Sequence, residues 1–142
     1  MMQKKVQIIS DGSLDLSQEL TKEKDIEVVP FYVSFDSETY QKEMVEVGVR
    51  EFYQEMVDHP TVFPKTSMPS VHDYYEVFEK YAKEQLPVIC ICITKKFSGS
   101  LQSATTAKDM ILEEYPDAQI AVIDSTVNTV LQGLYVLEAC RL

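Results

Sequence analysis

Four short segments of the chain are rich in hydroxyl side chains, and three of them also contain glycine, aspartate or asparagine. They read S-D-G-S at residues 10–13, T-S-M-P-S at 66–70, T-K-K-F-S-G-S at 94–100 and D-S-T-V-N at 124–128. Hydroxyls and free backbone amides donate hydrogen bonds to the oxygen atoms of a sugar, a phosphate or a carboxylate. Each segment alone is better explained by turns and helix N-caps, which use the same residue types. Together, the four segments favour one site that holds the oxygen atoms of a ligand.

A catalytic site built on these hydroxyls has no evident general base. A serine nucleophile at Ser98 or Ser100 would need an activating base, and the two histidines of the chain are His59 and His72. His72 follows the T-S-M-P-S segment closely, but a single histidine gives little support for a triad. We therefore predict no catalytic residue.

Metal and nucleotide sites are also weakly indicated. Asp11, Asp15 and Asp124 stand near the ends of predicted strands, where aspartate caps a turn or a helix more often than it binds an ion. Neither of the glycine-rich nucleotide motifs, G-x-x-x-x-G-K-[ST] and G-x-G-x-x-G, occurs in the sequence. We predict no metal site and no cofactor.

Composition limits the class of protein. The chain has 142 residues, of which 45% are hydrophobic and 25% charged, the usual balance of a folded domain. Its formal net charge of -10 opposes contact with a phosphate backbone and excludes a nucleic-acid partner. No stretch approaches the roughly 20 apolar residues of a membrane span, and the apolar run 6–9 is too short for a signal peptide. These features predict a cytoplasmic protein without stable membrane insertion.

The positions of apolar residues predict strands that alternate with helices. Strands are expected at 6–10, 26–35, 87–93 and 119–123, and helices at 49–57, 70–85, 100–115 and 128–142, with a loop at 59–69. A short polar helix capped by Ser17 is expected between the first two strands. This order predicts one α/β domain over residues 1–142, with a largely parallel sheet flanked by helices. Ligands of such sheets bind beyond the carboxyl ends of the strands. Three of the hydroxyl segments lie there, directly after predicted strands.

The segments together resemble the landmarks of the DegV family. That family has an Asp-Ser-Thr-Ala-Asp-Leu type start, a Val-Val-Pro-Leu strand, a Thr-Ser-Gln-Pro-Ser signature, a Ser-x-x-Leu-Ser-Gly-Thr loop and a late Asp-Ser pair. Here the corresponding segments are D-G-S-L-D-L at 11–16, V-V-P-F at 28–31, T-S-M-P-S at 66–70, T-K-K-F-S-G-S at 94–100 and D-S at 124–125. The resemblance covers almost the whole chain in the same order, and it implies the fold of the DegV N-terminal domain.

The resemblance also implies a function. Members of the family bind a long-chain fatty acid and present its carboxylate to a partner fatty acid kinase, which makes acyl phosphate for phospholipid synthesis. By this resemblance the chain is a lipid-binding protein and not itself an enzyme, with the fatty acid as its ligand. Thr66 and Ser98 would hold the carboxylate. Five further residues would shape the pocket: Ser67, Gly99, Ser100, Asp124 and Ser125.

The chain departs from the family pattern in residues and in length. Gly12 stands where the family has a serine, Met68 where it has a glutamine, and Ser100 where it has a threonine. The family also has a second, C-terminal domain that closes over the acyl chain and supplies basic residues near the carboxylate. We therefore expect the 142 residues to be the N-terminal portion of a longer protein, truncated before that domain.

Two alternatives to lipid binding remain at this stage. One is an enzyme that acts on a small phosphorylated or hydroxylated substrate, with Asp11 or Asp124 as the base. The other is a structural remnant without a ligand, in which the hydroxyl segments only cap their helices. Turnover by the purified protein without a partner would favour the first, and failure of the full-length protein to carry or bind any lipid would favour the second.

Overall fold

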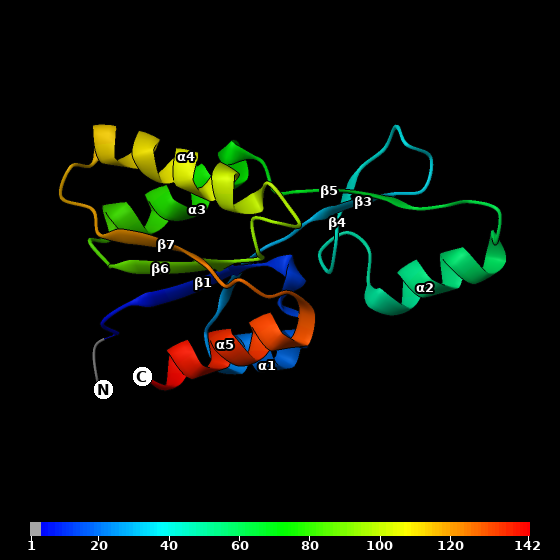
Figure 1. Ribbon diagram of the computed structural model, residues 1–142, viewed down its shortest axis with the longest axis horizontal. Coiled ribbons are helices and arrows are strands. Elements are labelled where there is room, and N and C mark those ends of the chain that lie inside the picture. The colour runs from blue at the N-terminus through cyan, green and yellow to red at the C-terminus, as the bar shows by residue number, and fades with distance from the viewer. Residues whose placement is uncertain (1–3) are drawn as a thin grey trace.

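A computed structural model describes residues 4–142 and places four parallel strands in one sheet (Figure 1). The strand order is β2-β1-β6-β7. The strands are β1 (Gln7–Asp11), β2 (Glu27–Val29), β6 (Val88–Cys92) and β7 (Ile120–Asp124). The predicted α/β fold with a largely parallel sheet is confirmed, and so are the predicted strands near 6–10, 87–93 and 119–123.

Helices cover both faces of this sheet. Helices α3 (Val71–Lys83) and α4 (Ser100–Glu114) lie on one face, and α1 (Gln18–Glu23) and α5 (Thr129–Arg141) lie on the other (Figure 1). Neighbouring residues of a strand point to opposite faces, so the strands divide their apolar side chains between two cores. Ile9, Cys90 and Phe78 belong to the core under α3 and α4, whereas Ile8 and Ile91 belong to the core under α1 and α5.

The predicted single strand at 26–35 is wrong, because Pro30 separates it into two strands. Residues Glu27–Val29 pair with β1 in the parallel sheet, whereas β3 (Tyr32–Ser34) enters a separate antiparallel sheet. Proline has no N–H to donate to a strand ladder and fixes its own φ angle. The chain therefore leaves the first sheet at Pro30.

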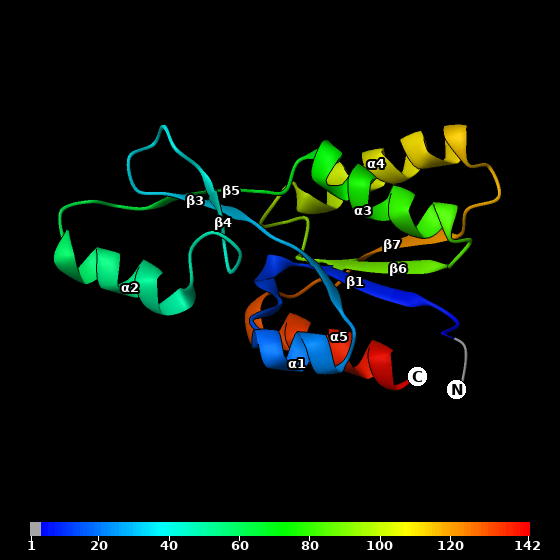
Figure 2. The ribbon, with the colours of Figure 1, turned by 180° about the vertical axis from the view of Figure 1, so that it is seen from behind.

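The second sheet has the order β4-β3-β5 and belongs to an arm, residues 31–67, that projects from one end of the parallel sheet (Figure 2). Its other strands are β4 (Gln41–Lys42) and β5 (Lys65–Ser67), and the arm also carries α2 (Val49–Asp58). The predicted helix at 49–57 is confirmed. The predicted loop at 59–69 is wrong at Lys65–Ser67, since these residues pair with β3 to form an edge strand.

Helix α3 begins with the predicted capping box. Ser70 Oγ accepts a hydrogen bond from the Asp73 amide at 3.1 Å, and Asp73 Oδ2 accepts one from the Ser70 amide at 2.8 Å. Asp73 Oδ1 also accepts a hydrogen bond from the Tyr32 hydroxyl at 2.8 Å. Asp73 therefore connects the start of α3 to β3 of the arm.

Replacing Ser70 with alanine is expected to lower the free energy of unfolding by about 1 kcal/mol, the usual effect of losing an N-cap side chain. Burial raises the pKa of Asp73, but the hydrogen bonds from Ser70 and Tyr32 outweigh it, so the net pKa lies below the usual 3.8. The stabilisation is therefore present at neutral pH and is lost as the pH falls through the folded-state pKa. Denaturant titrations at pH 7 and pH 3 measure both effects. An unchanged midpoint at pH 7 would show that the cap contributes nothing.

Candidate functional site

The carboxyl ends of β1, β6 and β7 bring three of the four hydroxyl segments together. Residues 94–99, called the Ser98 loop below, follow β6 and precede α4. The Thr94 amide donates to the Val127 carbonyl at 3.0 Å, and the Ser125 amide donates to the Cys92 carbonyl at 3.0 Å. The loops after β6 and β7 are therefore joined by backbone hydrogen bonds.

The T-S-M-P-S segment reaches the same place through Met68. A Cβ atom built on Gly99 would lie 2.7 Å from Met68 Sδ, so the Met68 side chain rests directly on the Ser98 loop. Thr66 and Ser67 precede Met68 on the exposed edge strand β5. The contact brings all four hydroxyl segments, far apart in the sequence, to one end of the sheet.

Ser98 lies in a turn that leaves its hydroxyl hydrogen available. The Phe97 and Ser98 amides donate to the Thr94 carbonyl at 3.0 and 3.3 Å, and Ser98 Oγ accepts from the Ser100 amide at 3.2 Å. A hydroxyl has one hydrogen to donate and can also accept. Within residues 4–142, neither Ser98 nor Thr66 has its hydroxyl hydrogen assigned to an acceptor in the protein, so both groups suit a ligand oxygen.

Ser100 has a different environment from Ser98. It is fully buried, and its hydroxyl donates to Asp11 Oδ2 at 2.8 Å. The Tyr74 hydroxyl lies 2.6 Å from the same oxygen of Ser100. The Ser100 side chain therefore belongs to the protein interior next to the Ser98 loop and does not face the solvent.

Asp124 and Ser125 use their side chains within their own turn. Asp124 Oδ1 accepts from the Thr126 amide at 2.9 Å, and Ser125 Oγ donates to the Val127 carbonyl at 3.1 Å. Thr126 has a φ angle of 62°, in the left-handed region that a β-branched residue rarely adopts. Both predicted residues thus hold the shape of the loop after β7, and their contact with a ligand stays a prediction.

The structure argues against the alternative in which Asp11 is the base of an enzyme. The Asp11 side chain has no solvent exposure, and its two oxygens accept hydrogen bonds from Ser13, Ile93, Ser100 and Gln132. A general base has to come within hydrogen-bond reach of a substrate proton. Asp11 is instead a structural acceptor that connects four elements.

Tyr74 and Gln132 belong to the same buried hydrogen-bond network and were missed by sequence reasoning. Both stand among apolar helix residues, and no local motif marks them. Gln132 Nε2 donates to Asp11 Oδ1 at 2.8 Å and to Ser10 Oγ at 3.1 Å.

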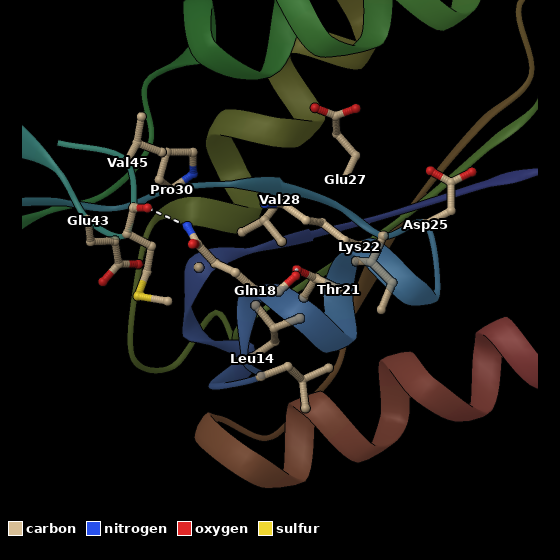
Figure 3. A pocket seen from close by; sticks show the side chains of 14 residues that line it. Leu14, Gln18, Thr21, Lys22, Asp25, Glu27, Val28, Pro30, Glu43 and Val45 are labelled. Atoms are coloured by element: carbon tan, nitrogen blue, oxygen red, sulfur yellow. Dashed lines mark hydrogen bonds between the residues drawn. The ribbon is translucent and has the colours of Figure 1, made fainter. Parts of the chain in front are cut away.

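A groove of about 230 Å³ lies between α1, β2 and the start of the arm, and Gly12 of the S-D-G-S segment lines it (Figure 3). Its walls are mostly apolar, with Glu43 at one end, and they include Leu14, Leu16, Ile26, Val28, Pro30, Met44 and Val45. Ligand pockets usually have volumes of roughly 300–1,000 Å³. This groove alone is therefore too small to enclose a long acyl chain.

Glu43 occupies the space that a side chain at position 12 would need. A Cβ atom on Gly12 would lie 2.0 Å from Glu43 Oε1, which also accepts a hydrogen bond from the Phe31 amide at 3.2 Å. Burial raises the pKa of Glu43, and the negative charges of Asp15 and Asp11 raise it further. The glycine that departs from the family pattern thus makes room for a partly buried carboxyl group.

Replacing Glu43 with glutamine is expected to stabilise the protein at pH 7 by up to about 1 kcal/mol, within the usual range of a point substitution. A carboxyl whose folded-state pKa is raised destabilises the fold as the pH rises above its unfolded pKa of about 4.3. Glutamine stays neutral and keeps an oxygen for the Phe31 amide. Thermal unfolding at pH 7 and pH 4 should show the gain at pH 7 only. The exposed Glu38→Gln is the control, and an equal gain at both pH values would contradict the role of charge.

No helix within residues 4–142 is long and apolar enough to cross a membrane. In the same part of the chain, no three His, Cys, Asp or Glu side chains are grouped so that they could hold a metal ion.

Three comparisons relate the chain to known proteins. It is 36% identical to a DegV domain-containing protein from Clostridium acetobutylicum over 97% of this chain and 47% of that protein. It superposes with a TM-score of 0.93 on a stearic acid-binding protein from Eubacterium ventriosum, at 48% identity, over 96% of this chain and 46% of that one. A fatty acid-binding DegV protein from Thermus thermophilus matches with a TM-score of 0.80 at 28% identity, over 96% of this chain and 46% of that one.

The chain therefore spans about half the length of the relatives that it matches. The sequence profile described as "Uncharacterised protein, DegV family" matches residues 5–142, which is almost the whole chain. The landmark segments, the fold and this match agree, and the chain belongs to the DegV family.

Proposed function

We propose that the protein binds a long-chain fatty acid and that the hydroxyls of Thr66 and Ser98 donate hydrogen bonds to its carboxylate. The observation that carries the proposal is the contact of Met68 with Gly99, which joins the segments of Thr66 and Ser98 at one end of the sheet. The 48% identity to a stearic acid-binding protein supports the same ligand class. Ser67, Gly99, Ser100, Asp124 and Ser125 would complete or support the pocket.

The start of α4 favours a negatively charged ligand at this place. The helix has 15 residues, Gly99 is its N-cap, and its first turn carries no acidic residue. The first amides of a helix have no partner within it, and the helix dipole stabilises a negative charge there. A carboxylate beside Ser98 would therefore gain from both the hydroxyl and the helix terminus.

Apolar side chains near these hydroxyls favour a ligand with a hydrocarbon tail. Phe97 in the Ser98 loop is 74% exposed, and Met68 against Gly99 is 44% exposed. Helix α5, which follows the Asp124 turn, also exposes Val130, Leu131, Leu134 and Tyr135. Burial contributes about 0.8 kcal/mol per methylene, so a tail would supply most of the affinity and the carboxylate would set the orientation.

We further propose that the protein acts as a carrier and not as a catalyst. In this role it would present the fatty acid carboxylate to a cytoplasmic fatty acid kinase, whose acyl phosphate product would enter phospholipid synthesis. The burial of Asp11 and the use of Asp124 within its own turn both argue against a general base at this site. A detectable turnover of a small phosphorylated substrate by the protein alone would contradict the carrier role.

The direct test is extraction of the purified full-length protein with organic solvent, followed by mass spectrometry, and then titration with stearate. The Eubacterium ventriosum stearic acid-binding protein serves as the positive control for the extraction. A fatty acid that co-purifies, or saturable uptake of one stearate per chain, is the expected result. A full-length protein that carries no lipid and takes up no stearate, under conditions where the control protein does both, would overturn the proposal.

A further inference from the structure

The two oxygens of the Asp11 carboxylate serve two different parts of the protein. Oδ2 accepts hydrogen bonds from Ser100 Oγ at 2.8 Å and from the Ile93 amide at 2.9 Å. Oδ1 accepts from Gln132 Nε2 at 2.8 Å and from Ser13 Oγ at 2.6 Å. One oxygen therefore faces the region of the Ser98 loop, and the other faces α5 and the 3-10 turn η1 (Gly12–Leu14).

The residues bound to Oδ2 stand at the two ends of the Ser98 loop. Ile93 immediately precedes residue 94, and Ser100 immediately follows residue 99. Both are buried, as is Asp11. A single carboxylate oxygen thus binds the residue on each side of the Ser98 loop, Ile93 and Ser100, and so holds the two ends of the loop at a fixed separation.

The direction of the hydrogen bonds at Ser100 follows from simple chemistry. A carboxylate only accepts, so the Ser100 hydrogen is used for Asp11, and the Tyr74 hydroxyl at 2.6 Å must donate to Ser100 Oγ. Burial, with the nearby Cys92, Cys90 and Asp11, raises the pKa of Tyr74 well above its usual value, so the phenol keeps its hydrogen. Buried hydrogen-bond chains of this kind hold their members in one arrangement.

The chain of hydrogen bonds from Tyr74 and Asp11 extends through Ser100 to Ser98. The Ser100 amide donates to Ser98 Oγ at 3.2 Å, which occupies one acceptor position of that oxygen. The orientation of the Ser98 hydroxyl therefore depends on where Ser100 is held, and Ser100 is held by Asp11 and Tyr74.

We infer that Asp11, acting through Ser100, is a positioning residue for the carboxylate site: it sets the Ser98 loop so that the Ser98 hydroxyl is presented to the ligand. This inference rests on the proposed fatty acid function. Asp11 would not touch the ligand. Its effect on binding would pass through its Oδ2 oxygen, while its Oδ1 oxygen would serve stability alone.

This division of the two oxygens allows a matched pair of variants. Ser100→Ala removes a donor to Oδ2, and Gln132→Ala removes a donor to Oδ1 of the same buried carboxylate. Both variants are expected to lower the unfolding midpoint, because each loses a buried hydrogen bond. Ser100→Thr keeps the hydroxyl and is the conservative variant expected to restore binding.

The experiment measures the affinity of each purified variant for stearate and for stearyl alcohol, which lacks the carboxylate. Ser100→Ala is expected to weaken stearate binding about tenfold, the effect of one lost hydrogen bond, with little change for the alcohol. In a protein that already carries Ser98→Ala, the same change should have no further effect, since residues that act as a unit are not additive. Gln132→Ala should leave the ratio of the two affinities unchanged. The inference would be overturned if Ser100→Ala and Gln132→Ala lost stearate affinity equally. It would also be overturned if the losses of stearate affinity in Ser100→Ala and Ser98→Ala were fully additive.

A second measurement needs no ligand and separates this inference from the proposed function. The backbone amide resonances of residues 94–100 are compared among the wild type, Ser100→Ala and Gln132→Ala by NMR. Shifts concentrated in this segment in Ser100→Ala alone support the positioning role, even if the wild type binds no stearate and the proposed function fails. Unchanged resonances in a folded Ser100→Ala protein would overturn the inference while leaving fatty acid binding to its own test.

Discussion

Replacing Ser98 with alanine is expected to weaken stearate binding by about 10- to 100-fold. A hydrogen bond to a charged group contributes roughly 1.5–3 kcal/mol, and about 1.4 kcal/mol corresponds to tenfold in affinity. Ser98 is half-buried, and its hydroxyl hydrogen is not assigned to an acceptor within residues 4–142, so its removal leaves no buried group unpaired except the Ser100 amide. The fold should therefore survive the change. Isothermal titration with stearate measures the loss.

A matched control for Ser98→Ala comes from the same helix region. Thr105→Ala also removes a hydroxyl, but the Thr105 hydrogen is donated to the Leu101 carbonyl within α4 at 2.8 Å. This variant should keep the affinity of the wild type. If Ser98→Ala binds stearate as tightly as Thr105→Ala does, the carboxylate is not held by Ser98, and the site must be sought elsewhere.

Replacing Gly133 with alanine is expected to destabilise the protein by about 3 kcal/mol, at the upper end of the usual range for overpacking. A Cβ atom at this position would lie 2.3 Å from the Leu14 carbonyl oxygen and 2.9 Å from Leu16 Cδ2. The first neighbour is backbone and cannot rotate away, so α5 would have to move off η1. Such a movement would also disturb Gln132, which is adjacent in α5 and bound to Asp11.

The sign of the Gly133 effect distinguishes packing from helix propensity. In an exposed helix, alanine is more favourable than glycine by about 1 kcal/mol, so propensity alone predicts a more stable protein. Gly48→Ala is the control, because a Cβ there has no heavy atom within 4 Å and its expected loss as an N-cap is below about 1 kcal/mol. Denaturant unfolding of both variants decides the case. A Gly133→Ala protein as stable as the wild type would mean that α5 does not pack closely against Leu14.

The contrast between Ser98 and Ser100 shows how far a motif can be interpreted. Both serines belong to one predicted segment and were assigned to one pocket. In the structure the Ser98 hydroxyl hydrogen has no protein acceptor within residues 4–142, whereas Ser100 donates its hydrogen to Asp11. Two residues along the chain are enough to separate a hydroxyl that is free to donate from one that is used inside the protein, because Ser100 is buried at the start of α4.

The sequence by itself determined the elements that depend on neighbours in the chain. The buried strand predicted at 87–93, the Ser70 and Asp73 capping box and the hydroxyl segments at strand ends were all predicted, since apolar runs and caps depend on a few consecutive residues. Only the tertiary structure decided that β3 and β5 would pair with each other in a second sheet, and that Asp11 would be buried. Those outcomes depend on contacts between distant residues: Asp11 lies 89 positions from Ser100 and 121 from Gln132. No local pattern encodes such pairs, because burial and partner are set when the layers pack together.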